Sequence, residues 1–173
     1  MRRRLLTVLL CTLLTGVPAT PVRAATDPPG AVVPSGDYGW PLPGWPRVAR
    51  AFDPPESTYG TGHRGVDLVA PPGTPVLAAG DGTVVFAGPL AGRGVVSVQH
   101  ADGLRTTYEP VTVAVAVGAH VARGDVLGAL EPGHPGCPAA ACLHWGVRRG
   151  AADYLDPLRL LGRWEVRLLP WAE

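Results

Sequence analysis

The chain has 173 residues, a length typical of one domain rather than two. It contains no lysine, which excludes lysine chemistry such as Schiff-base formation or lipoyl attachment. Four of its 15 basic residues, Arg2, Arg3, Arg4 and Arg23, lie in the first 24 residues, so 11 basic residues remain beyond them against 14 acidic ones. A mildly acidic domain has no electrostatic basis for binding nucleic acid.

Residues 1–24 are predicted to be a secretory signal peptide. A basic start precedes a short apolar run at 5–14, and a small-x-Ala sequence follows at 22–24. This arrangement is typical of an export signal, and the apolar run is shorter than a membrane span requires. We therefore expect a secreted domain with no membrane anchor after cleavage; a retained anchor helix is the alternative.

The next segment, residues 25–39, is rich in proline and glycine and has no periodicity, which predicts a linker. The folded domain is predicted to span residues 40–161, with Trp40 and Trp45 packed at its edge. Residues 162–173 are predicted to be a C-terminal tail.

Short apolar runs separated by glycine turns predict an all-β domain. Asp-Gly turns indicate one hairpin that joins 76–79 to 83–86 and a second that joins 95–99 to 104–108. Further strands are expected at 111–117, on both sides of a tight turn within 121–128, and at 143–147, the last strand. A short helix is expected at 156–161, with Asp156 as its N-cap and Pro157 at its first position.

Two separate segments supply side chains that can bind a metal ion. In an extended chain alternate residues share a face, so His63 and Asp67 point the same way, with Gly65 clearing space between them. In the second segment, His144 points away from its two apolar neighbours. Together His63, Asp67 and His144 supply two nitrogens and one oxygen, a set typical of catalytic zinc with a fourth position open.

Three patterns along the chain resemble a known family. They are Gly-His-Arg-Gly-Val-Asp-Leu at 62–68, Gly-x-x-Val-x-x-Gly-Asp-x-x-Gly at 118–128, and Leu-His-Trp-Gly-Val at 143–147. In this order they resemble the lysostaphin/LytM family of peptidoglycan zinc endopeptidases, over about residues 40–161. The resemblance implies that His63, Asp67 and His144 bind Zn²⁺. It also implies a compact antiparallel β-sheet or sandwich with a zinc-containing groove and a lipoyl-like hairpin element, and peptidoglycan peptides as substrate.

The chain departs from this family at both of its usual catalytic histidines. Cys142 stands at the first histidine of the family's His-x-His pattern, and Pro110 stands two residues after Tyr108, where the second is usual. A positioned acid/base group contributes roughly 10²- to 10⁴-fold in rate. Two functions therefore compete: a zinc metalloendopeptidase with a relocated acid/base group, and a catalytically impaired cell-wall binding or regulatory module that retains zinc.

His134 and Glu109 are the candidates for the relocated group. His134 lies on the loop that enters the last predicted strand. On a regular strand Glu109 points away from the face that Tyr108 and Pro110 share, so a bulge would be needed to redirect it. A hydroxyl of Tyr108 or Tyr59 is a weaker alternative, as a hydrogen-bond donor to an oxyanion.

The two cysteines beyond the signal peptide, Cys137 and Cys142, are an even pair in an exported domain, which predicts a disulfide. Such a bridge would hold the loop of His134 beside the metal. The alternative is a Cys142 thiolate that completes the zinc coordination and makes the site structural.

Overall fold

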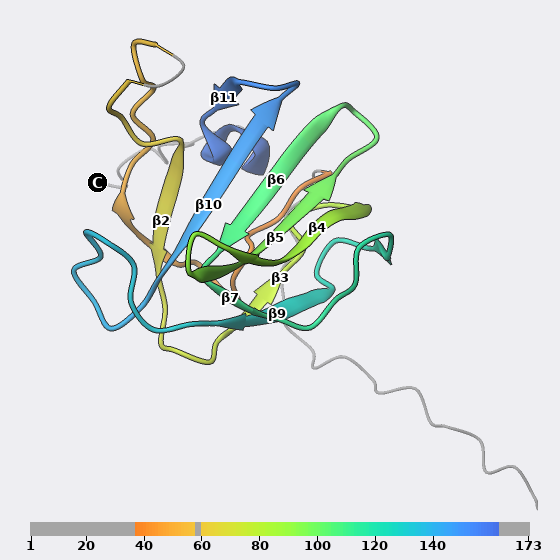
Figure 1. Ribbon diagram of the computed structural model, residues 1–173, viewed down its shortest axis with the longest axis horizontal. Coiled ribbons are helices and arrows are strands. Elements are labelled where there is room, and N and C mark those ends of the chain that lie inside the picture. Colours follow the sequence, from red (N-terminus) through yellow and green to blue (C-terminus); the bar gives the residue numbers. More distant parts are fainter. Residues whose placement is uncertain (1–36, 58–59, 163–173) are drawn as a thin grey trace, which may run out of the picture. The chain divides into compact units, whose positions relative to one another are not determined.

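The computed structural model describes residues 37–57 and 60–162 (Figure 1). The predicted signal peptide, residues 25–36 of the predicted linker, Tyr59 and tail residues 163–173 lie outside the described residues. Among those that are described, no helix is both long and apolar enough to cross a membrane. The folded part includes two residues of the predicted linker, because Tyr38 is buried and bridges Gly80 while Gly39 donates its N–H to the carbonyl of Ala79.

The domain is all-β, as the sequence predicts, and every pairing between its strands is antiparallel (Figure 1). In spatial order the larger sheet contains β1 (Arg47–Arg50), β2 (Gly65–Val69), β10 (Cys142–Arg149), β6 (Leu104–Glu109), β5 (Arg93–Gln99), β4 (Gly82–Leu90) and β8 (His120–Val121), and β11 (Asp153–Leu155) pairs with β10. The smaller sheet contains β3 (Pro75–Leu77), β9 (Val126–Leu130) and β7 (Val111–Val113). A 3₁₀ helix, η1 (Pro157–Leu161), follows β11, and Asp156 caps it by accepting the N–H of Leu158.

The larger sheet separates the core from the candidate site, because successive strand residues face opposite sides. On β10, Leu143, Trp145 and Val147 are fully buried in a core that the smaller sheet also joins through Val76 and Leu127. The alternate residues of the same strand face the other side. The centre of the large sheet thus gives one apolar face to the core and one polar face to the site.

One of the two predicted hairpins is correct. β5 pairs with β6 around the turn at 101–103, with Gln99 opposite Arg105. The other is wrong, because β3 pairs with β9 in the smaller sheet and β4 pairs with β5 and β8 in the larger one. The Asp-Gly turn between β3 and β4 therefore carries the chain from one sheet to the other instead of closing a hairpin.

Other predicted elements are present with different bounds. The strand predicted at 111–117 ends at Val113, and the strand predicted at 143–147 extends from Cys142 to Arg149 and is followed by β11. The turn within 121–128 does join two strands, although β8 belongs to the larger sheet and β9 to the smaller one.

Candidate metal centre

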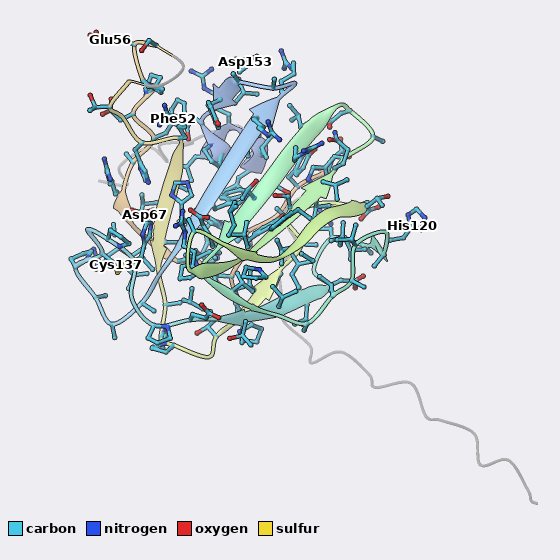
Figure 2. All side chains as sticks on the ribbon, viewed as in Figure 1. Phe52, Glu56, Asp67, His120, Cys137 and Asp153 are labelled. Carbon is cyan, nitrogen blue, oxygen red and sulfur yellow. A yellow bond between two sulfur atoms is a disulfide. The ribbon has the colours of Figure 1, made fainter. Side chains whose placement is uncertain are left out.

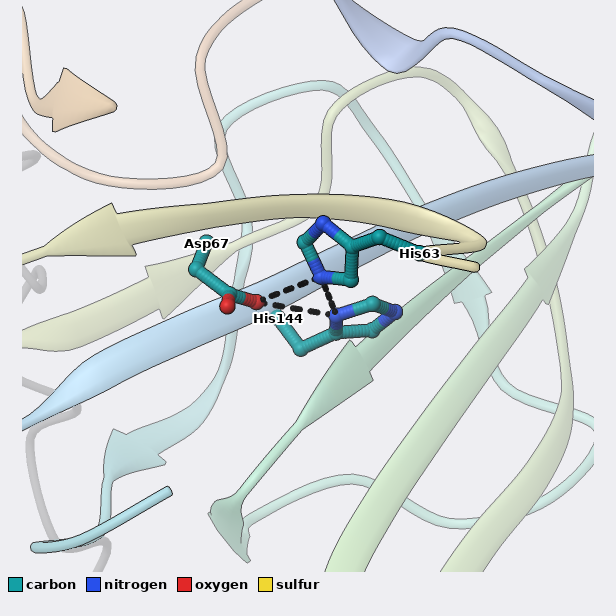
Figure 3. A group of neighbouring side chains, drawn as sticks. All are labelled: His63, Asp67 and His144. Carbon is teal, nitrogen blue, oxygen red and sulfur yellow. Dashed lines mark hydrogen bonds and ion pairs between the residues drawn. The ribbon is translucent and has the colours of Figure 1, made fainter. Parts of the chain in front are cut away.

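Two neighbouring strands carry the candidate metal ligands. Asp67 on β2 lies directly opposite His144 on β10 in the antiparallel register. His63 precedes β2 and is held in place by two backbone hydrogen bonds, because its N–H donates to the carbonyl of Asp53 and its carbonyl accepts from the N–H of Asp53. The sheet therefore brings together residues 63 and 144 from distant parts of the chain (Figure 3).

The three side chains converge on a small triangle of ligand atoms. His63 Nε2, His144 Nδ1 and Asp67 Oδ1 lie 3.0 Å from one another along each edge (Figure 3). A tetrahedral zinc site with bonds of about 2.0–2.1 Å would separate its ligand atoms by roughly 3.3 Å. The spacing of the three atoms thus fits a tetrahedral metal site.

The hydrogen bond of the other nitrogen of His63 supports this fit. His63 Nδ1 lies 2.7 Å from the carbonyl oxygen of Ala51, and because a carbonyl only accepts, Nδ1 carries the proton. In the neutral ring, Nε2 then presents a lone pair toward the carboxylate of Asp67. Two acceptors at 3.0 Å repel each other unless a cation lies between them. Such a carbonyl contact also fixes the ring orientation of metal-binding histidines.

Asp67 is fully buried, and its two oxygens differ sharply. Oδ1 has three imidazole nitrogens at 3.0 Å, from His63, His134 and His144. Oδ2 is buried and has no hydrogen-bond partner among the described residues. Burial alone would raise the pKa of Asp67, but the hydrogen bonds from His134 and His144 outweigh it and hold this pKa well below its usual value. Asp67 is therefore a buried anion with one oxygen that lacks a partner.

Gly65 provides the space that the site needs. A Cβ at this position would collide with the carbonyl oxygen of Trp145 and would lie 2.7 Å from His144 Nε2. At Gly146, on the neighbouring strand, an added Cβ would meet its nearest atom, the carbonyl oxygen of Arg64, at 3.4 Å. Only the first of these glycines is required by the close approach of the imidazole.

His134 lies beside the triangle. Its Nε2 is 3.0 Å from Asp67 Oδ1, and its ring meets that of His144 edge-on at 5.7 Å between centroids. The group in which all ligand atoms lie within 4.8 Å of one another contains His63, Asp67 and His144, without His134. His134 thus contacts a candidate ligand rather than completing the triangle.

A disulfide ties the segment that carries His134 to β10. Cys137 and Cys142 form a disulfide with a Cα–Cα distance of 5.8 Å, as the sequence predicts. Two backbone hydrogen bonds join the segment before Cys137 to the loop that the disulfide closes: the N–H of Gly133 donates to the carbonyl of Ala140, and the N–H of Cys137 donates to the carbonyl of His134. Because Cys142 is bonded to Cys137, it is not the thiolate zinc ligand of the alternative hypothesis.

Glu109 needs no bulge to reach the side of the sheet that carries the site, because it lies directly opposite His144 and lines the same groove. Its carboxylate accepts a hydrogen bond of 2.9 Å from Arg93, and this bond raises the pKa of the Arg93 guanidinium. The carboxylate is thus neutralised by a cation, which weakens the case for it as a general base.

Tyr108, the weaker predicted candidate, does not join the site, and neither do two further histidines. The hydroxyl of Tyr108 is buried in the core, where it contacts Thr106 Oγ1 and accepts the N–H of Ala79. His120 lies across the domain from Asp67 (Figure 2). His100 is bound within the core-side network of Thr106.

The sequence is similar to a known peptidase family and to several bacterial proteins. The family model of Peptidase family M23 matches residues 61–157. An uncharacterised protein of Mycobacterium tuberculosis is 57% identical over 135 residues, which are 76% of this chain and 54% of that protein. The DD-carboxypeptidase/endopeptidase Mpg of Neisseria meningitidis is 36% identical over 87 residues, 50% of this chain and 20% of that protein. This chain therefore spans about half the length of the mycobacterial relative, and less of the neisserial one.

Among solved structures, the catalytic domain of lysostaphin from Staphylococcus simulans superposes with a TM-score of 0.58 at 25% identity. The superposition covers 67% of this chain and 92% of that domain. The matched family region covers more than half of the chain and contains the strands β2 and β10, and the superposition shows the same fold, so the chain belongs to Peptidase family M23.

Proposed function

We propose that this chain is an extracytoplasmic, zinc-dependent peptidase that hydrolyses peptide bonds of bacterial peptidoglycan. The observation that carries the proposal is the buried carboxylate of Asp67, which faces two imidazole nitrogens and has one oxygen without a partner. Family membership and the peptidase names of the relatives support the peptide substrate. The disulfide supports an oxidising, extracytoplasmic location.

His63, Asp67 and His144 are the residues proposed to hold the metal. Zinc at such a site supplies a Lewis acid that polarises a carbonyl and lowers the pKa of water. Ala51 orients the ring of His63 through its carbonyl, and Gly65 leaves room for the ring of His144. These contacts keep the ligand atoms fixed before substrate arrives.

His134 is proposed as the relocated acid/base group. Its side chain is 15% exposed and contacts Asp67, so it lies where it can exchange protons with a substrate bound at the metal centre, while the nearby disulfide ties its segment to β10. Cys142 stands where the family usually has a catalytic imidazole, and its bridge to Cys137 ties the loop of His134 to β10. One imidazole is lost at this position and another is supplied from the loop.

A cell-wall binding or regulatory module that retains the metal is the second candidate. The observation that favours it is the absence of both usual catalytic imidazoles, at Cys142 and at Pro110. It predicts metal binding and wall binding without new peptide ends.

The test is mass spectrometry of the products after purified peptidoglycan is incubated with the zinc-loaded, oxidised chain. New peptide ends that disappear with Asp67→Ala are expected. His134→Gln should retain bound zinc and lower the hydrolysis rate by about 10²- to 10⁴-fold. Wall binding without any cleavage would support the second candidate, and an unchanged rate for His134→Gln would remove His134 from the mechanism.

A further inference from the structure

A groove runs along the polar face of the large sheet, away from the candidate metal centre. It has a volume of about 490 Å³ and is lined at one end by His144. Its floor is formed by Gly146 on β10, Thr107 opposite it on β6 and Ser97 opposite that on β5. The hydroxyls of Ser97 and Thr107 lie 3.1 Å apart and share a hydrogen bond. None of these three floor residues carries a charge.

The far end of this groove carries an unusual pair of cations. Arg105 on β6 lies directly opposite Arg148 on β10, and both line the groove. Like charges directly opposite each other destabilise a sheet. Across the described ranges 37–57 and 60–162, no carboxylate lies within 4.0 Å of either guanidinium.

The contacts that these two arginines do make are with neutral groups. Arg105 donates from Nε to the side-chain oxygen of Gln99 at 3.1 Å, and Arg148 donates from Nη1 to the carbonyl of Ala151 at 2.7 Å. By contrast, Arg93 has a counterion in Glu109, which lines the same groove opposite His144. The arginine pair is thus held in position with its charge uncompensated.

The distance from this pair to the metal centre fits a short peptide. His144 and Arg148 are four residues apart on β10, or about 13 Å at the usual rise of a strand. An extended ligand peptide has the same rise per residue. Because an arginine side chain is long, its guanidinium group can lie closer to the metal centre than its Cα does. A carboxylate about two to four residues from a peptide bond at the metal centre would therefore reach the pair.

We propose that Arg105 and Arg148 form an anion subsite that binds a free carboxylate of an extended substrate peptide about two to four residues from the bond that is cleaved. Guanidinium groups bind carboxylates through paired, charge-assisted hydrogen bonds, which give both affinity and geometric selectivity. This inference rests on the proposed function and gives it a substrate class: short peptides with a free carboxylate, in preference to neutral ones. The local charge of the groove supplies the attraction that the mildly acidic domain as a whole lacks.

The test compares two peptides: N-acetylated penta-alanine with a free C-terminal carboxylate, and its C-terminal carboxamide. Binding to the zinc-loaded chain is measured by isothermal titration, with mass spectrometry to check that the peptides stay intact. The carboxylate peptide should bind about tenfold more tightly, and the double variant Arg105→Gln/Arg148→Gln should abolish this preference. The matched control, Arg149→Gln/Arg159→Gln, removes the same charge from exposed positions outside the groove and should retain it.

The variants also distinguish the arginine subsite from carboxylate binding by the metal itself. A carboxylate bound by the metal would keep its preference in Arg105→Gln/Arg148→Gln, which would contradict the proposal. Equal binding of the two peptides, no measurable binding of either, or an equal loss in the control variant would also overturn it. Because Arg105→Gln/Arg148→Gln relieves a like-charge contact, its melting temperature should equal or exceed that of the native chain.

Hydrolysis is scored separately, in the peptidoglycan digest. Carboxylate preference without any cleavage would keep the subsite and reject the peptidase. Cleavage without carboxylate preference would keep the peptidase and reject the subsite.

Discussion

Two buried histidines of this domain have the same exposure and very different surroundings. His63 and His100 are each 5% exposed. His100 Nδ1 donates to the carbonyl of Asp81 at 2.8 Å, so its Nε2 accepts from Thr106 Oγ1 at 2.8 Å. Thr106 in turn can accept from Tyr108, whose oxygen accepts the N–H of Ala79, so every donor around His100 has an acceptor.

Around His63, by contrast, hydrogen-bond donors and acceptors are not matched. Its Nδ1 is likewise fixed as a donor by a carbonyl, that of Ala51, but its Nε2 faces the carboxylate of Asp67 and the nitrogen of His144. Asp67 Oδ2 has no hydrogen-bond partner in the part of the chain that the structure describes. The comparison teaches that donor and acceptor balance, rather than burial, distinguishes a structural histidine from a candidate metal ligand.

The largest expected effect distinguishes the first cluster (His63, Asp67 and His144) from the second (His100, Thr106 and Tyr108) by their effect on zinc binding. His144→Ala should lower zinc affinity by more than about 100-fold, because loss of even a supporting group around a metal site costs about 10- to 100-fold. Competition with a chelating dye measures this affinity. Unchanged zinc binding would show that His144 is not a ligand.

The matched change in the other cluster is His100→Ala. It should leave zinc affinity unchanged but lower the free energy of unfolding by about 1–3 kcal/mol, because Thr106 loses its partner in a buried environment. Urea unfolding measures the difference. A loss of zinc comparable to that of His144→Ala would erase the distinction between the clusters.

Removal of the metal should destabilise the native chain, because zinc bound by the first cluster stabilises the folded state. At a free zinc concentration of 100 times the dissociation constant, bound metal adds about 2.7 kcal/mol to the free energy of unfolding. A chelator should therefore lower the melting temperature of the native chain by several degrees and leave that of His144→Ala unchanged. An equal response of the two proteins would place the stabilising metal elsewhere.

Gly65→Ala should disturb the geometry of the candidate metal ligands through a steric clash, without removing a ligand. The new methyl group would collide with the carbonyl oxygen of Trp145 and with the ring of His144, with a cost of about 1–3 kcal/mol and weaker zinc binding. Gly146→Ala, where the added methyl group has room, is the control and should bind zinc like the native chain. Equal zinc affinities for the two variants would contradict a steric role for Gly65.

A smaller effect is expected in the second cluster at high pH. Burial raises the pKa of Tyr108 to about 12, against an ordinary value of 10.0. The unfolded chain loses this proton first as pH rises, so the stabilisation is complete below pH 10 and is lost between pH 10 and 12. At pH 11 the free energy of unfolding should have fallen by about 1 kcal/mol from this residue.

Tyr108→Phe is the variant that assigns this pH dependence. It removes the ionisable phenol, so urea unfolding of the variant should show a correspondingly smaller loss of stability between pH 9 and pH 11. Tyr38, whose pKa is also raised by burial, accounts for part of the remaining loss. An equally steep decline in Tyr108→Phe would mean that other groups dominate.

The parts of the molecule that could be predicted from sequence are those governed by local alternation and turn chemistry. The β5–β6 hairpin follows from an Asp-Gly turn between two alternating segments. The shared face of His63 and Asp67 follows from alternation, and Gly65 clears space as expected, but their 3.0 Å contact also needs the bend at Arg64 that precedes β2.

Features that depend on contacts between distant segments could not be predicted in this way. The turn before β4 has hairpin chemistry, yet β3 finds its partner in β9, about fifty residues away. The contact of His134 with Asp67 depends on the path of the segment that the disulfide ties to β10. The ion pair of Glu109 with Arg93 depends on how β5 and β6 project their side chains into the groove, which periodicity alone does not specify.

The most direct test of the proposed metal centre is anomalous diffraction at the zinc edge from crystals of the zinc-loaded chain. We predict one strong peak bonded to His63 Nε2, His144 Nδ1 and the carboxylate of Asp67, with His63 Nδ1 still donating to Ala51. A peak at other residues, or no peak and an unchanged His63–Asp67 contact in zinc-saturated crystals, would contradict it.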